Sequence, residues 1–262
     1  MDETYQTHVN RVARLTLPAS YASQLQNLQS SPKFQRQKEG KIEAASFPGY
    51  SIISPPYRED SHNEEFYQHL QDTQQQLIQQ VGEGLLIPVP PKSFHVTLAD
   101  LIWDSGYREA VRENPNFDQQ LKNRITESFQ QCNPVVSQGK PVYWQLLGLM
   151  VRPRAIAVCL VPKDEKDYER TIALRRCIYQ NSSLIGLGIE QQYHFTAHVT
   201  LGYFGEIPDN LDRDRLTDTL TDFNDRWLAA EQQVFQLHRA ELRKFDDMTR
   251  YYREEDFPVM EF

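Results

Sequence analysis

Two copies of one tetrapeptide, His95-Val96-Thr97-Leu98 and His198-Val199-Thr200-Leu201, decide how this 262-residue chain folds. The copies lie 103 residues apart, and β-branched and aromatic neighbours favour a strand around each of them. Successive side chains of a strand face opposite sides, so the histidine and threonine of each copy share one face and the aliphatic residues share the other. We therefore expect two half-buried strands that each present an imidazole and a hydroxyl group.

The segments around these strands predict the same order of elements twice. Apolar residues recur at helical spacing after each expected strand, and the first helix begins at a capping-box pattern, Ser61 to Glu64. Shifted by the same 103 residues, the first expected helix coincides with the third, which indicates an internal duplication. The expected strands cover 43–53, 94–98, 142–161 (broken at Arg152-Pro153), 195–204 and 234–242, and the expected helices cover 61–82, the stripe Phe117 to Phe129, 165–181 and the stripe Leu216 to Trp227.

These patterns predict an α+β fold with two similar lobes. A chain of this length can bury a full core, and 39% hydrophobic with 24% charged residues is an ordinary globular composition. We expect one bilobed domain with an N-terminal arm at 1–40, a first lobe at about 41–135, a second lobe at about 136–245 and a C-terminal tail at 246–262.

Charge and cysteine content exclude several classes of function. A net charge of -8 opposes tight binding to long nucleic acid, although a small phosphodiester, a nucleotide or an RNA end stays compatible with it. The apolar stretches are too short to span a bilayer and the start lacks a signal-peptide pattern, so we expect a cytoplasmic protein with no membrane partner, favoured as a monomer. Three cysteines without CxxC spacing indicate neither disulfides nor a thiolate metal site.

The repeated imidazole and hydroxyl groups suit phosphoryl chemistry. If the halves are related by a pseudo-twofold axis, His95 and His198 flank one anion across a single cleft. One neutral imidazole then takes a proton from the attacking oxygen, while the other, as imidazolium, donates to the leaving oxygen. The hydroxyls of Thr97 and Thr200 donate to the non-bridging oxygens. This scheme requires no metal and no cofactor.

Paired His-x-Thr motifs on strands about a hundred residues apart are typical of the two-histidine phosphoesterase superfamily, which the chain resembles over roughly residues 40–245. Members of this superfamily include cyclic phosphodiesterases and bacterial enzymes first described as RNA 2′-5′ ligases. The resemblance implies a bilobed α+β fold, with antiparallel sheets lining a central groove and helices outside. The chain is most similar to a bacterial branch known mainly as a domain of unknown function, through residues 45–50, 94–98 and 188–204.

The resemblance implies catalytic roles for His95 and His198 and phosphate-binding roles for Thr97 and Thr200. The leading hypothesis is a metal-independent phosphoesterase acting on a small phosphodiester, such as a 2′,3′-cyclic nucleotide or an RNA end with that group. With a ribose hydroxyl as nucleophile, the same site would catalyse ligation instead. A third alternative is a module that binds a nucleotide or phosphate without turnover, which we disfavour because Arg or Lys would suffice for binding alone.

Other polar residues are weaker candidates. His194 opens a third His-x-Thr and faces the same way as His198 by strand parity, either as a groove contact or as a strand-end histidine. Zinc binding by this pair is disfavoured, because no general-base Glu lies between them and the region is β-rich. His62 and His238 have no repeated context, so a surface or boundary position is expected for each. Tyr50 and Tyr143 are also candidate groove contacts, although we favour a packing role for both. Arg152 and Arg154 are the last candidates, and for them we favour a β-turn with solvated side chains.

Overall fold

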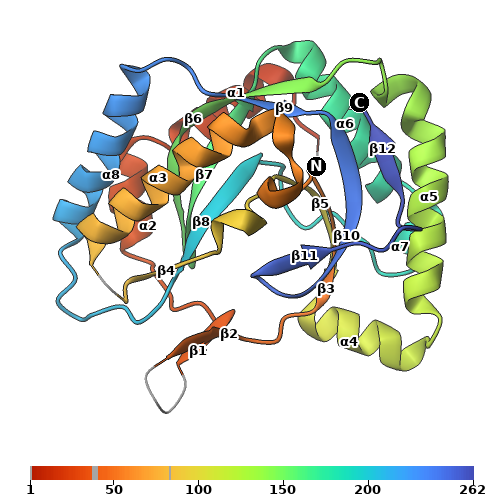
Figure 1. The fold of residues 1–262 in the computed structure, drawn as a ribbon, viewed down its shortest axis with the longest axis horizontal. Coiled ribbons are helices and arrows are strands. Elements are labelled where there is room, and N and C mark those ends of the chain that lie inside the picture. The colour runs from red at the N-terminus through yellow and green to blue at the C-terminus, as the bar shows by residue number, and fades with distance from the viewer. Residues whose placement is uncertain (1, 37–40, 83) are drawn as a thin grey trace.

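The computed structural model describes residues 2–36, 41–82 and 84–262, and it confirms the predicted α+β class. Two antiparallel sheets form its centre and helices cover their outer sides (Figure 1). Among the described residues, no helix combines the length and apolar character needed to cross a membrane. The helices are α1 (Tyr5–Arg14), α2 (Pro18–Leu25), α3 (Glu64–Val81), α4 (Asp104–Glu113), α5 (Phe117–Val136), α6 (Glu165–Tyr179), α7 (Ser182–Ile185) and α8 (Arg213–Leu228).

Each sheet has its own strand order. The first runs β11-β10-β3-β5 with β12 also paired to β10, and the second runs β4-β8-β7-β6-β9. A separate pair, β1 (Phe34–Arg36) and β2 (Ile42–Ala44), projects at the bottom of Figure 1. The first sheet is made of β3 (Gly49–Ile53), β5 (Thr97–Trp103), β10 (Arg239–Asp247), β11 (Arg250–Tyr252) and β12 (Val259–Glu261), and the second of β4 (Leu86–Pro88), β6 (Val142–Arg152), β7 (Ala155–Pro162), β8 (His198–Phe204) and β9 (Val234–Leu237).

The sheets exchange strands between the two halves of the chain. The strand β4 comes from the first half but pairs with β8, whereas β10 comes from the end of the chain and pairs with β3. The single strand expected over 234–242 is divided at His238, where the chain leaves β9 in the second sheet for β10 in the first. Strand pairing therefore crosses the expected boundary near 135, and 246–262 supplies two strands rather than a free tail. Local periodicity cannot reveal such long-range pairing.

The N-terminal arm contributes α1 and α2, which lie against the second sheet, and β1 near its end. Val12 of α1 packs with Met150 and Ala157, and the hydroxyl of Tyr21 in α2 donates to the Leu149 carbonyl at 2.6 Å. Residues 1 and 37–40 of the expected arm lie outside the described residues.

The helix predictions hold, with one exception at a helix start. The apolar stripe of α5 is buried throughout, and α3, α6 and α8 cover the expected segments. The capping box at Ser61 to Glu64 is wrong: residues 61–63 form a 3-10 turn, and the backbone amide of His62 donates to the Asp60 carboxylate at 3.1 Å. The aspartate one residue earlier supplies the cap instead.

The predicted alternation along both motif strands is confirmed. Val96, Leu98, Val199 and Leu201 are buried, whereas the histidine and threonine of each copy are half-buried on the opposite side. The strand predicted at 94–98 is displaced, because β5 begins only at Thr97. His95 therefore lies just before its strand, while His198 opens β8.

Candidate active site

The four motif side chains line one cavity of about 560 Å³ between the two sheets. His95 and Thr97 reach it from the start of β5, and His198 and Thr200 reach it from β8. Each copy of the repeated tetrapeptide thus supplies one histidine and one threonine to the same site. The aliphatic residues of each tetrapeptide pack in the core and hold these side chains in place.

Each catalytic candidate is held by the same backbone contact. The Nδ1 atom of His95 lies 2.7 Å from the Ser93 carbonyl, and the Nδ1 atom of His198 lies 2.8 Å from the Thr196 carbonyl. A carbonyl can only accept, so each Nδ1 carries the proton and donates it. Each ring therefore keeps Nε2 as its unprotonated nitrogen, which is the atom needed for proton transfer.

The cavity keeps both imidazoles neutral. Burial lowers the pKa of His95 to about 4, although the Ser93 carbonyl opposes this shift. Burial also lowers the pKa of His198 to about 3, and the nearby charges of Arg152 and His95 add to the effect. Because protonation of one ring disfavours protonation of the other, the two histidines are electrostatically linked across the site.

Two β-bulges in β5 bring further side chains to the cavity. Thr97, Asp100 and Trp103 all line it, although residues three apart would face opposite sides of a regular strand. The pairing with β3 shifts register between Thr97 and Ala99 and again between Asp100 and Ile102, and each shift turns the following side chain inward. Asp100 and Trp103 could not be found by strict alternation.

The second copy repeats this irregularity. In β8 a register shift against β7 lies between Thr200 and Gly202, so that Thr200 and Tyr203 both line the cavity. Tyr203 is separated from Asp100 by the same 103 residues that separate the two histidines. A bulge at the same place in both copies supports the internal duplication.

Cationic side chains surround the phosphate-binding candidates. Arg152 lines the cavity, and its Nε atom is buried without a hydrogen-bond partner. Lys33 also lines the cavity, with Nζ 4.7 Å from the centre of the Phe47 ring. Asp100 lies near both cations and accepts a hydrogen bond from Ser51 at 3.3 Å. An anion in the cavity would meet positive charge and one unused arginine donor.

The favoured interpretation of Arg152 as a solvated turn residue is wrong. The turn is present at residues 153–154, but Arg152 is the last residue of β6 and its side chain lies in the cavity, where burial lowers its pKa. Arg154 also lines the cavity, but it is exposed and its Nε donates to Gln29 at 3.1 Å.

Three weaker candidates lie outside the cavity. His194 is half-exposed, with Nδ1 3.6 Å from the Glu3 carboxylate. Tyr50 is buried against Tyr107 and Phe257, which agrees with its packing alternative. Tyr143 has Lys163 above its ring at 5.2 Å and likewise does not line the cavity. The structure therefore does not bring these three to the paired motifs.

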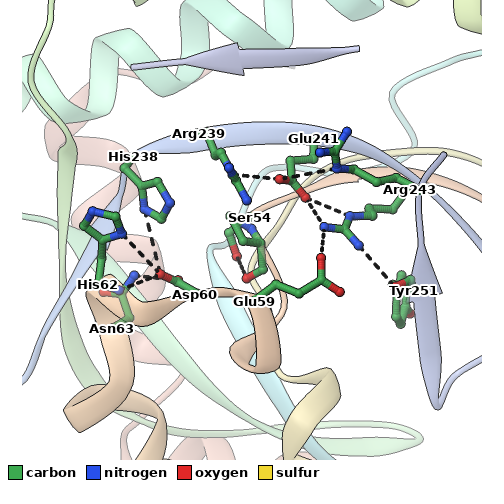
Figure 2. A network of polar contacts seen from close by, with 12 residues as sticks. Ser54, Glu59, Asp60, His62, Asn63, His238, Arg239, Glu241, Arg243 and Tyr251 are labelled. Atoms are coloured by element: carbon green, nitrogen blue, oxygen red, sulfur yellow. Dashed lines mark hydrogen bonds and ion pairs between the residues drawn. The ribbon is translucent and has the colours of Figure 1, made fainter. Parts of the chain in front are cut away.

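The C-terminal strands complete the wall beside His95. The ring of Tyr251 lies 4.2 Å from the His95 ring, centre to centre. Behind it, buried Arg243 donates to the carboxylates of Glu241 and Glu59 (Figure 2). The charge of Arg243 contributes to the lowered pKa of His95. No sequence motif predicts this wall, because β10 and β11 join the first sheet only through long-range pairing.

Comparison with known proteins agrees with this geometry. Residues 33–138 match the family described as 2H-phosphodiest, Domain of unknown function (DUF1868). Over this segment the chain is similar to the two-histidine phosphodiesterase family. The matched segment contains the first motif, and the second motif lies 103 residues further along the chain. The match supports a phosphoesterase type of function, and no curated protein matches the chain.

A solved structure shares the fold, and another is less similar. The conserved protein of unknown function ATU0111 from Agrobacterium tumefaciens is 16% identical, with a TM-score of 0.58 over 89% of this chain and 96% of that one. LigT of E. coli in complex with 3′-AMP is 12% identical, with a TM-score of 0.43 over 82% of this chain and 98% of LigT. The first of these likenesses shows that the chain shares its fold with that protein.

Proposed function

We propose that this protein is a metal-independent phosphoesterase that hydrolyses a small phosphodiester, with a 2′,3′-cyclic nucleotide or an RNA end bearing that group as the substrate class. The observation that carries the proposal is the matched pair of Nδ1–carbonyl bonds at His95 and His198. These bonds fix the same tautomer on both rings and leave both Nε2 atoms available beside one cavity.

The reaction divides the proton transfers between the two rings. One neutral imidazole accepts a proton from water as its oxygen forms the new bond to phosphorus. The other, as imidazolium, donates a proton to the ribose oxygen as the old phosphorus–oxygen bond breaks. The hydroxyls of Thr97 and Thr200 and the free donor of Arg152 stabilise the charge on the non-bridging oxygens.

The rest of the cavity suits a nucleoside. A volume of about 560 Å³ lies within the usual range for small-molecule sites. Aromatic rings of Phe47, Trp103 and Tyr203 line it and offer faces on which a base can stack. The proposal includes a monomer in the cytoplasm.

A substrate panel tests this proposal. The purified protein is incubated in EDTA with 2′,3′-cyclic nucleotides, linear phosphodiesters and RNA ends, and products are identified by mass spectrometry. We expect a monophosphate product from the wild type and from His194→Ala, which removes an imidazole outside the cavity. His95→Ala and His198→Ala should form almost none.

The other outcomes separate the alternatives. Joined oligonucleotides would indicate the ligation reaction, and tight binding of a panel member without any product would indicate a binding module. Full hydrolysis by both His95→Ala and His198→Ala would refute the proposed chemistry.

A further inference from the structure

A second cluster of titratable side chains lies outside the cavity. Asp60 faces two histidines that are distant in sequence, with Oδ1 4.0 Å from Nδ1 of His62 and 3.9 Å from Nδ1 of His238 (Figure 2). All three ligand atoms lie within 4.8 Å of one another. The two imidazole rings are 4.2 Å apart, centre to centre. His62 and His238 line a hollow of their own. Among the described residues, none lines both this hollow and the cavity between the two sheets.

The carboxylate of this cluster is rigidly held. Its side chain is fully buried, and Oδ2 accepts a hydrogen bond from the Asn63 amide at 2.7 Å. The same amide group exchanges two hydrogen bonds with the backbone of Gln236, at 2.9 and 2.7 Å. Such outer contacts orient metal-binding carboxylates in known sites. They leave Oδ1 of Asp60 directed at the two histidines.

The Nδ1 atom of each histidine lies at nearly the right separation from the Asp60 carboxylate, and Nδ1 of His238 also lies 3.5 Å from the Gln236 carbonyl, a long contact that metal binding would replace. Zinc bonds of about 2.0–2.2 Å place tetrahedral ligand atoms roughly 3.4 Å apart, so each histidine must approach Asp60 by about half an ångström. His62 can make this movement, because 59% of its side chain is exposed. A carboxylate with two imidazoles is a donor set that suits zinc and neighbouring transition metals, and not magnesium or calcium.

The geometry points to a Zn²⁺ site formed by Asp60, His62 and His238, with a fourth position open to solvent. That position faces a hollow of about 400 Å³, which Glu59 and Glu261 also line. Lys140 and Arg239 line the same hollow and offset the charge of the two acidic groups, so the attraction for a divalent cation comes from the three ligands themselves.

The place of the site in the fold defines its effect. His238 lies where the chain passes from β9 in the second sheet to β10 in the first, and the other two ligands precede α3. A metal ion here ties the junction of the two sheets to the start of a helix. Since metal binding to the folded state alone adds to folding stability, bound Zn²⁺ stabilises the fold without entering the phosphoryl cavity.

Titration with the metal alone tests the site. The full-length protein is stripped with a chelator and titrated with ZnCl₂ by calorimetry, and with CoCl₂ by visible absorption. We expect one equivalent of Zn²⁺, a Co²⁺ spectrum typical of tetrahedral coordination, and a rise of Tm on adding Zn²⁺. His62→Ala and His238→Ala should each weaken binding roughly 100-fold or more.

A matched control tests whether histidines outside the cluster bind the metal. His194→Ala removes an imidazole from a different surface and should keep wild-type binding and the rise of Tm. Because the His62 side chain is mostly exposed, His62→Ala is expected to fold, and circular dichroism checks this. Absence of zinc binding by the wild type, or undiminished binding by both His62→Ala and His238→Ala, would overturn the inference.

Discussion

A bound phosphate should change the protonation of the two candidate catalytic rings. In the free protein, a pKa of about 4 for His95 means that roughly one ring in a thousand is protonated at pH 7. Acid catalysis requires one imidazolium, so the negative charge of the substrate must stabilise the protonated ring.

The magnitude follows from the charge of the phosphodiester. One negative charge about 4 Å from the ring contributes about 4 kcal/mol at the effective dielectric constant of a protein site, which corresponds to roughly three pKa units. The pKa of His95 is then expected near 7 in the complex, and that of His198 about one unit lower, because Arg152 also opposes its protonation. His95 is therefore predicted to be the acid and His198 the base.

Nuclear magnetic resonance of the ring Cε1–H groups measures this directly. The protein is titrated from pH 8 to pH 5 with and without inorganic phosphate, and spectra of His95→Gln and His198→Gln assign the two signals. We expect both rings to stay neutral throughout in the free protein, and the His95 signal to titrate near pH 7 when phosphate is bound. Ordinary titration near pH 6.5 in the free protein, or no change with phosphate, would refute the reasoning.

Three further predictions follow from the same geometry. A nitrophenyl leaving group needs no protonation, so phosphodiesters with that group should restore activity to His95→Ala and not to His198→Ala; equal rates in the two variants would contradict the assignment. Arg152→Gln removes a charged hydrogen-bond donor worth about 1.5–3 kcal/mol, so KM should rise roughly 10- to 100-fold, while nuclear magnetic resonance should show a higher pKa for His198. Finally, a folded histidine with a lowered pKa binds fewer protons than its unfolded form between about pH 4 and pH 6.5, so stability rises with pH across this window. Urea unfolding at pH 5 should therefore show a loss of about 2 kcal/mol per ring relative to pH 7, and His95→Gln should reduce that loss; an unchanged difference would count against a buried neutral ring.

The duplicated tetrapeptide made much of the site predictable. Strand alternation placed the histidine and threonine of each copy on one face, and the structure brings all four to one cavity. Helical spacing likewise predicted α5, whose stripe from Phe117 to Phe129 is buried. Both predictions rest on local periodicity, which the chain expresses within a few residues.

The remaining site residues depend on features without a local signal. Asp100 and Tyr203 reach the cavity only because bulges interrupt the alternation of their strands. The sequence around Arg152 favours a solvated turn residue, because its burial in the cavity depends on the packing of the two sheets and has no local signal. Tyr251 arrives through pairing between segments far apart in the chain. The cluster around Asp60 joins His62 to His238 in the same non-local way.

The most direct test of the central claim is the single-turnover rate of 2′,3′-cyclic nucleotide hydrolysis by the wild type, His95→Ala, His198→Ala and the double variant. If the two rings transfer protons in one reaction, each single variant should lose about 10²- to 10⁴-fold, and the double variant should be little slower than the slower single one. A wild-type rate in either single variant, or a double variant whose loss is the product of the two single losses, would contradict the account.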